Sequence, residues 1–294
     1  ILTSDGWLGI DALDEGARVL AMDIATGVYA EQQVKDKVIF DYEGEMVHLR
    51  AQGRKAPVDA LVTLDHRVVY KHSGRRWHAM PWVVKPAAQL PAGGQIGIPV
   101  SGPVDKPDMQ IGDDMIRVLG WLITDGSFSR NYRQPVYVIS QSKPNRVAEI
   151  TGLLQRSFGV VHDSVTPNNG GPHNREKQGL PLHRFYLGAE PSRQVWAWLG
   201  EGAHRIPRSI LSTASPRQLR ILFLEMMKGD GEWPVKAQKR GRFFPGKDKG
   251  LADDFQERCT RLGIRSVLHK KCDNPGEIVV NVSRDSVQRR PSRA

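Results

Sequence analysis

The chain is poor in cysteine and in long apolar runs. Only Cys259 and Cys272 occur among 294 residues, and neither lies in a CxxC pair, so the sequence predicts neither a zinc site nor a disulfide framework. Two isolated cysteines favour a reducing compartment, and we expect a cytoplasmic location in a bacterial or phage context. No apolar run approaches the roughly 18 residues of a membrane helix, so no membrane partner is expected.

The first residues also lack features. The opening Ile1–Gly6 has no basic region of the kind that begins a signal peptide, and the first residue is not Met. These two observations favour a processed or excised fragment over a secreted precursor.

Acidic residues are the scarcer charge. The chain has 32 Asp and Glu against 42 Lys and Arg, a net charge of +10, and its isoelectric point is about 9.7. Such a field attracts polyanions, so nucleic acid is the expected partner; a merely soluble basic protein is the alternative. The basic residues cluster with aromatic ones in between (Trp233, Phe243, Phe244), at Lys236–Arg242, Lys247–Lys249, Lys270 and Lys271, and Arg284–Arg293.

Two apolar segments of helical character each end in Asp-Gly, 105 residues apart: Val118–Gly126 and Phe223–Gly231. An aspartate at a helix C-terminus adds to the negative end of the macrodipole and costs up to about 1 kcal/mol. An aspartate at the C-terminus of both helices therefore predicts a cation that compensates the negative charge. We expect the glycine that follows each aspartate to be left-handed. A buried helix with a glycine cap is the alternative for either segment alone.

The small residues in these segments predict a close helix pair. Gly120 and Thr124 lie one turn apart, and Gly229 takes the equivalent place in the second segment. Because the side chains at the contact set the distance between packed helices, we expect Asp125 and Asp230 to be brought together.

Both segments resemble the LAGLIDADG motif of homing endonucleases. The resemblance implies two pseudo-symmetric αββαββ units, joined through the motif helices, with Asp125 and Asp230 binding divalent metal over the DNA backbone. Two positions depart from the pattern. The usual motif glycine is Gly120 in the first helix but Glu225 in the second, and the earlier acid is replaced by Ile123 and Lys228.

The first hundred residues predict a different kind of domain. Short alternating segments separated by Gly-containing turns are typical of an all-β structure. They resemble a Hint (hedgehog/intein) splicing domain: Leu2–Leu13 is similar to its first block, Val62–Arg67 to its second, and Trp82–Pro99 to its closing segment. The resemblance implies that Thr63 and His66 activate the upstream peptide bond, since an imidazole near neutral pKa can protonate a leaving nitrogen. A locally bonded Thr and His is the alternative.

Splicing itself is not expected of this chain. No Cys or Ser nucleophile precedes the first block, and the last residues contain no His-Asn pair. A trimmed splicing half and a decayed one both fit this observation.

The expected fold is therefore α+β. It has an all-β Hint-like domain at 1–100, a Pro- and Gly-rich linker at 101–111, and two pseudo-symmetric LAGLIDADG repeats at 112–204 and 205–294. Each repeat reads as helix, strands, helix, strands, with the second helices at 146–158 and near 251–262. The strands should form one DNA-binding saddle, because two-stranded ribbons fit the major groove.

The resemblance also implies the site. Asp125 and Asp230 would hold Mg²⁺, which Ca²⁺ or Mn²⁺ can replace, with help from the helix-end residues Thr124 and Gly229, and Lys270 or Lys271 would lie near the attacking water. The candidate DNA contacts are Arg130, Arg133, Gln141, Arg175, Arg184, Lys236, Lys239, Arg240 and Arg242.

The sequence thus favours a site-specific double-strand DNA homing endonuclease carried in an intein and acting as a monomer. Two alternatives stay open: a nucleic-acid-binding protein of the same fold that does not cut, and a splicing protein with a decayed nuclease. The survival of both motif acids favours cleavage.

Overall fold

The computed structural model describes residues 1–50, 59–72, 80–91, 96–129, 136–159, 161–167, 179–201, 204–233, 240–271, 274 and 276–283, with only the backbone of Arg240. Within these ranges the chain forms five small sheets and six α-helices. The mixed α/β composition that the sequence predicts is confirmed. No helix in the described ranges is both long and apolar enough to span a bilayer.

Residues 113–283 contain one structural unit twice. Repeat 1 consists of α1 (Asp113–Asp125), β10 (Gly126–Ser129), β11 (Val136–Gln141), α2 (Pro144–Phe158), β12 (His162–Pro167), β13 (Pro181–Tyr186) and α3 (Ala189–Leu199). Repeat 2 consists of α4 (Arg208–Thr213), α5 (Pro216–Gly229), β14 (Gly231–Glu232), β15 (Arg240–Phe243), α6 (Lys249–Arg261), β16 (Ser266–Lys270) and β17 (Ile278–Ser283). Both sheets are antiparallel and have the same order, β10-β11-β13-β12 and β14-β15-β17-β16.

Local signals begin and end these helices. Ser215 caps α5 in a reciprocal capping box with Gln218, and proline takes the first helical position. Asp248 caps α6 through the backbone N–H of Leu251. Gly159 and Gly263, which follow α2 and α6, have φ values of 75° and 69°, as expected of residues just past a helix end.

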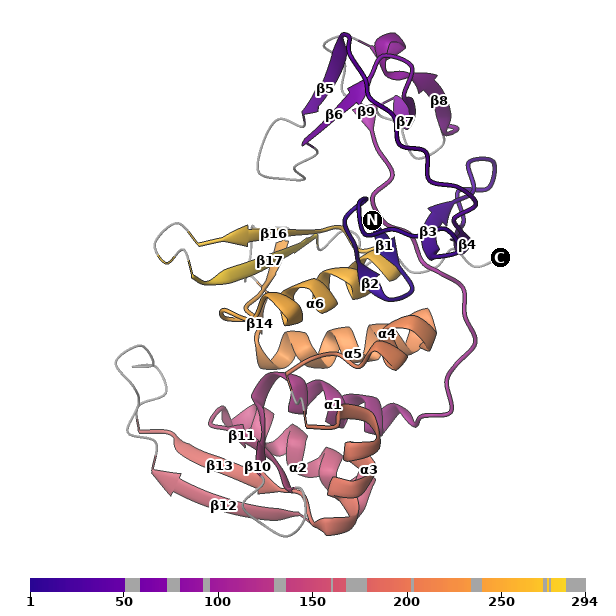
Figure 1. Ribbon diagram of the computed structural model, residues 1–294. Helices are drawn as coiled ribbons and strands as arrows, with labels where there is room; N and C mark the ends of the chain where they lie inside the picture. Colours follow the sequence, from indigo (N-terminus) through magenta and orange to yellow (C-terminus); the bar gives the residue numbers. More distant parts are fainter. Residues whose placement is uncertain are drawn as a thin grey trace.

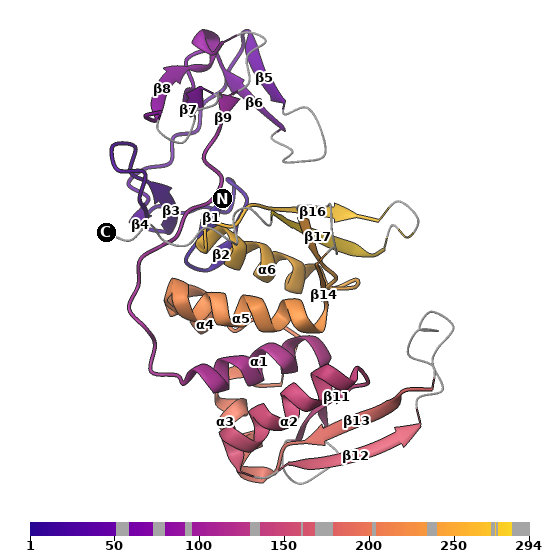
Figure 2. The same ribbon diagram turned by 180° about the vertical axis from the view of Figure 1, so that it is seen from behind.

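The four long helices lie in one stack in the order α6, α5, α1, α2, with α1 against α5 at its centre (Figures 1 and 2). The hairpins β12–β13 and β16–β17 extend from the same side of this stack, and the segment before α1 runs down the opposite side. A continuous apolar core joins both repeats and includes Trp121, Leu122, Phe223 and Phe255, all fully buried. The two repeats are therefore one body.

The first hundred residues are all β among those described, apart from a short 3₁₀ turn, but they form two bodies. The first sheet has the order β2-β1-β3-β4, from β1 (Leu2–Thr3), β2 (Gly6–Trp7), β3 (Arg18–Met22) and β4 (Tyr29–Gln33). The second body is the β5–β9 lobe, made of β5 (Met46–Arg50), β6 (Asp59–Thr63), β7 (Arg67–His72), β8 (Val83–Pro86), η2 (Ala87–Gln89) and β9 (Ile96–Gly97). The first sheet lies on α6, whereas the lobe lies farther from the helices (Figures 1 and 2).

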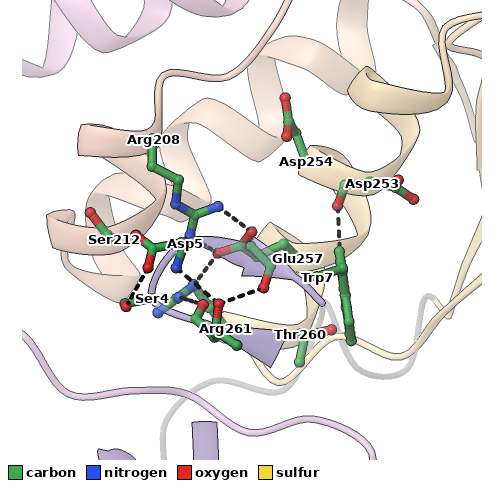
Figure 3. Close-up of polar contacts among 12 residues, drawn as sticks. Ser4, Asp5, Trp7, Arg208, Ser212, Asp253, Asp254, Glu257, Thr260 and Arg261 are labelled. Carbon is green, nitrogen blue, oxygen red and sulfur yellow. Dashed lines mark hydrogen bonds and ion pairs between the residues drawn. The ribbon is translucent and has the colours of Figure 1, made fainter. Parts of the chain in front are cut away.

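Buried charges hold the first sheet on repeat 2. Arg261, which is 2% exposed, donates to the carbonyl of Thr3 (3.2 Å) and pairs with Glu31 (2.8 Å) and Glu257 (2.8 Å). Glu257 also binds Arg208 of α4 (Figure 3). This set of contacts makes residues 1–33 part of the body that the two repeats form.

The expected linker is packed as well. Backbone N–H groups of Gly102 and Val104 donate to the carbonyls of Thr260 (3.2 Å) and Arg261 (3.3 Å). Lys106 binds Glu31 (3.0 Å) and the α4 carbonyl of Ser212. Residues 102–106 thus contact both the first sheet and repeat 2, with isolated β-bridges at Pro103 and Val104.

Candidate active site

The two motif helices cross at small residues. A Cβ placed on Gly120 would lie 2.8 Å from the Cβ of Glu225, and one placed on Gly229 would lie 2.2 Å from Oγ1 of Thr124. Both separations are far below ordinary contact, so only glycine fits at either position. The close helix pair that the sequence predicts is confirmed, even though Glu225 replaces the second motif glycine.

This crossing brings the two acids to the same place. Asp125 is the last residue of α1 and Asp230 is the C-cap of α5, with its N–H donating to the carbonyl of Met226 (3.1 Å). A Cβ on Gly229 would lie 2.8 Å from Oδ2 of Asp125. The carboxylate of α1 therefore lies against the residue that precedes Asp230, and both aspartates are half-buried.

The glycines after the acids are not left-handed, contrary to our expectation. Gly126 has φ −88° and ψ 160°, and Gly231 is absent from the positive-φ glycines. Both positions are instead crowded. A Cβ added at Gly126 would lie 2.1 Å from the carbonyl oxygen of Leu122, and one added at Gly231 would lie 2.4 Å from the carbonyl oxygen of Met227. The chain turns directly from helix into strand, so glycine is required for space and not for its backbone angles.

Gln141 lies beside Asp125, one of the two motif acids. We expected it to face DNA, yet it is only 5% exposed, and its Nε2 lies 3.5 Å from Oδ2 of Asp125. Its Oε1 accepts from the backbone N–H groups of Ser142 (3.0 Å) and Lys143 (3.1 Å), so the amide is fixed with its donor toward the acid. The strand pairing alone decides this placement, which the sequence does not show.

The two halves of the site differ at this position. Gln141 lies two residues beyond the strand partner of Gly126, and the residue two beyond the strand partner of Gly231 is Pro245. Proline has no side-chain donor. At this strand position the Asp125 half therefore has an amide side chain and the Asp230 half has a proline.

The two candidate lysines differ in position. Lys270 is exposed at the end of β16. Lys271 pairs with Glu277, and its Nζ lies 5.7 Å from the centre of the Phe244 ring. The N–H of Phe244 donates to the carbonyl of Asp230 (2.9 Å). Lys271 is thus separated from the Asp230 backbone by one aromatic residue, and its role in catalysis stays a prediction.

Two described DNA-contact candidates, Arg184 and Arg242, lie on the sheet faces that point away from the helices. Arg184 precedes the buried Phe185 on β13 and donates to Thr166 (3.1 Å). Arg242 precedes the buried Phe243 on β15 and pairs with Glu232 (3.1 Å). Because successive strand residues alternate between faces, both arginines are on the open side of their sheets.

Other candidates fall outside what can be placed. Arg130, Arg133, Arg175, Lys236 and Lys239 lie outside the described residues, and the side chain of Arg240 is not described either. Their contacts with DNA stay predictions from the sequence.

The expected splicing pair is not brought to the start of the chain. Thr63 donates to Asp65 (2.6 Å), and His66 is exposed on the turn between β6 and β7 of the β5–β9 lobe. The N-terminus lies beside α6 in both views (Figures 1 and 2). Arg261 holds β1 there through the carbonyl of Thr3. The described partners of both residues, among them Met46 opposite Thr63 and the N–H of Ala87 on the His66 carbonyl (2.8 Å), lie within the β5–β9 lobe.

Cys259 offers no reactive thiol. It is fully buried in α6, and burial raises its pKa to about 12, so it carries almost no thiolate near neutral pH. Its neighbour Arg258 is equally buried, with its guanidinium 4.2 Å from the Phe255 ring centre, and burial lowers its pKa to about 10. Both residues belong to the core.

The oxygen donors at the helix crossing fit a hard divalent cation. No cluster of three or more His, Cys, Asp or Glu suited to a metal occurs among the described residues. Mg²⁺ needs no such cage, since it commonly binds one or two carboxylates, several waters and substrate phosphate oxygens. Asp125 and Asp230, with the helix-end carbonyls of Thr124 and Gly229, supply a donor set of that kind.

Comparisons with known proteins give structural likeness only. No protein-family model matches the sequence, and no match to a curated protein was found. Similar solved structures are LAGLIDADG proteins. A variant of I-DmoI in complex with its target DNA and Mg is 19% identical, over 60% of this chain and 92% of that one, with a TM-score of 0.42. I-WcaI bound to its DNA recognition sequence is 8% identical, over 60% and 78%, with a TM-score of 0.42. The N-terminal LAGLIDADG domain of DUF199/WhiA is 7% identical, over 61% and 83%, with a TM-score of 0.39. At these values the function has to be inferred from this chain's own residues.

Proposed function

We propose that this chain is a metal-dependent endonuclease that cuts both strands of duplex DNA at a specific site and acts as a monomer. The observation that carries the proposal is the meeting of Asp125 and Asp230 at the crossing of two equivalent helices. Each acid lies at the negative end of its helix, where a carboxylate is unfavourable without a cation. Two such sites related by an internal repeat suit the two antiparallel strands of DNA.

The chemistry follows from the donor set. Mg²⁺ held by the two aspartates would polarise a phosphate and activate a water as the nucleophile. Gln141 holds the Asp125 carboxylate in one orientation through its Nε2. Thr124 donates to the carbonyl of Gly120 (3.1 Å) and so keeps the last turn of α1 closed beside the acid. These residues place the carboxylates before any substrate binds.

DNA recognition is assigned to the open faces of the two sheets. Arg184 and Arg242 lie on these faces, and sheets that extend from the same side of the helix stack can contact one duplex (Figure 1). Phosphate contacts by a chain with a charge of +10 would make binding strongly dependent on salt. The expected response is weaker binding at higher salt with unchanged sequence preference.

We also propose that this endonuclease is carried in an intein and acts in homing. This proposal is supported by the sequence resemblance of residues 1–100 to a Hint domain. Arg261 holds β1 on α6 through the carbonyl of Thr3, whereas Thr63 and His66 belong to the β5–β9 lobe. The nuclease proposal is independent of this point.

The test is Mg²⁺-dependent cutting of a randomised duplex library, with the cut ends sequenced. The variants are Asp125→Asn and Asp230→Asn, and Asp23→Asn is the matched control because Asp23 only caps a turn at Thr26. Discrete staggered cuts that both site variants lose, and the control keeps, are expected. Specific binding without any cut by the wild-type chain would instead establish a binding protein of the same fold.

A further inference from the structure

Four charged residues connect the two repeats beside the candidate active site. Glu225 of α5 lies 3.7 Å from Arg117 of α1, and Lys228 of α5 binds Glu149 of α2. Lys228 also binds both carboxylate oxygens of Glu225, at 2.9 and 3.0 Å. We call Arg117, Glu225, Lys228 and Glu149 the cross-repeat brace.

One member of the brace is buried, and the other three, Arg117, Lys228 and Glu149, are 34%, 28% and 35% exposed. The Glu225 side chain is only 6% exposed, and removing one partner of a buried pair leaves an uncompensated charge. Burial raises the pKa of Glu149, but hydrogen bonds and charge from Lys228 and Arg146 lower it further, so the net shift is downward. The Glu149 carboxylate therefore stays ionised and paired with Lys228 at neutral pH.

Two members of the brace, Glu225 and Lys228, occupy the positions at which the sequence of the second motif helix differs from that of the first. The residues 105 positions earlier are Gly120 and Ile123, which carry no charge, and Ile123 is fully buried. One flank of the crossing is therefore held by apolar packing and the other by ion pairs. Glu225 and Lys228 replace the usual residues without opening the helix pair, since Gly120 still contacts the Cβ of Glu225.

Lys228 lies close to both acids. Lys228 is adjacent to Gly229, which contacts Asp125, and is two residues before Asp230. A shift of α5 against α2 would therefore move one acid relative to the other. Two carboxylates that share a cation with DNA phosphates must keep a fixed separation.

We propose that Glu225 and Lys228 are positioning residues that fix α5 against repeat 1 and so set the separation of Asp125 and Asp230. This inference rests on the proposed function for its catalytic consequence, though not for its structural one. Mutation of residues that orient metal ligands typically lowers metal affinity by about 10- to 100-fold.

The test measures helix position and metal dependence separately. Spin labels at Thr151→Cys on α2 and Leu224→Cys on α5, both exposed positions, report the distance between the two helices in a Cys272→Ser background. The brace variants are Lys228→Met and Glu149→Gln, Lys228→Arg tests rescue, and Lys249→Met removes an exposed ion pair with Asp253 as the matched control.

We expect a narrow distance distribution in the wild-type chain, broadened in both brace variants and restored by Lys228→Arg. The Mg²⁺ concentration for half-maximal cutting should rise about 10-fold in the same variants, with DNA binding retained. Unchanged distances and Mg²⁺ dependence, with only a loss of stability, would overturn the inference. A wild-type chain that cuts no DNA would refute the proposed function, while the label distances would still decide the role of the brace.

Discussion

Replacing Gly229 by alanine tests the close approach of the motif helices directly. The new Cβ would lie 2.2 Å from Thr124 Oγ1 and 2.8 Å from Asp125 Oδ2, whereas unstrained contacts between non-bonded carbon atoms are about 3.5–4.0 Å. The helices must separate by roughly 1 Å to relieve this overlap. Such overpacking typically costs about 1–3 kcal/mol of stability.

The effect on cutting should exceed the effect on stability. A misplacement of about 1 Å at a reacting centre can lower a rate by about 100-fold, and Asp125 lies directly against the new methyl group. We expect Gly229→Ala to remain folded, bind DNA and cut about 100-fold more slowly. Urea unfolding and single-turnover cleavage of a labelled duplex measure the two quantities on the same preparation.

A second helical glycine supplies the control. Gly152 lies within α2, and a Cβ there would meet only the tip of Arg156 at 3.5 Å. Gly152→Ala should therefore stabilise the protein by about 0.5–1 kcal/mol and leave cutting unchanged. If Gly229→Ala matched Gly152→Ala in both assays, the reasoning about the helix crossing would be refuted.

Three further changes have expected outcomes. Arg261→Met should lower the free energy of unfolding by about 3 kcal/mol in a denaturant titration, because buried carboxylates lose their partner; a change below about 0.5 kcal/mol, typical of surface substitutions, would contradict this. Acid should destabilise the fold. Burial raises the pKa values of Glu31 and Glu149, but their basic partners lower these values more, so both net pKa values lie below 4.5. The stability they add is thus full above pH 4.5 and is lost as pH falls through the lowered values, which thermal melts at pH 3–6 would detect. Gln141→Leu should slow the cut made by the Asp125 half more than the other cut, as strand-specific labels would show; equal slowing would count against a local role.

The sequence predicts those parts of the fold that short-range chemistry decides. The Ser215–Pro216 start of α5 and the glycines after α2 and α6 depend on neighbours within a few residues. The closeness of Asp125 and Asp230 is predictable for a similar reason, because small residues at helical spacing mark a packing face.

The remainder depends on contacts that spacing does not encode. Gln141 reaches Asp125 only because β11 pairs with β10 in one register. Gly126 reads as a left-handed cap, yet the immediate turn into β10 requires it for space. The docking of residues 1–33 on α6 needs Arg261 to meet Thr3 across 258 residues, and the charges on α6 look like an ordinary solvated face in the sequence.

That long-range contact has a consequence during synthesis of the chain. Thr3 leaves the ribosome 258 residues before Arg261, and at about 5–20 residues per second the interval is about 10–50 s. Through that time β1 and β2 have no helix to lie on, and β1 can pair only with its own neighbours in the first sheet. The strand β1 therefore reaches its final place among the last steps of folding, after most of the two repeats has been made.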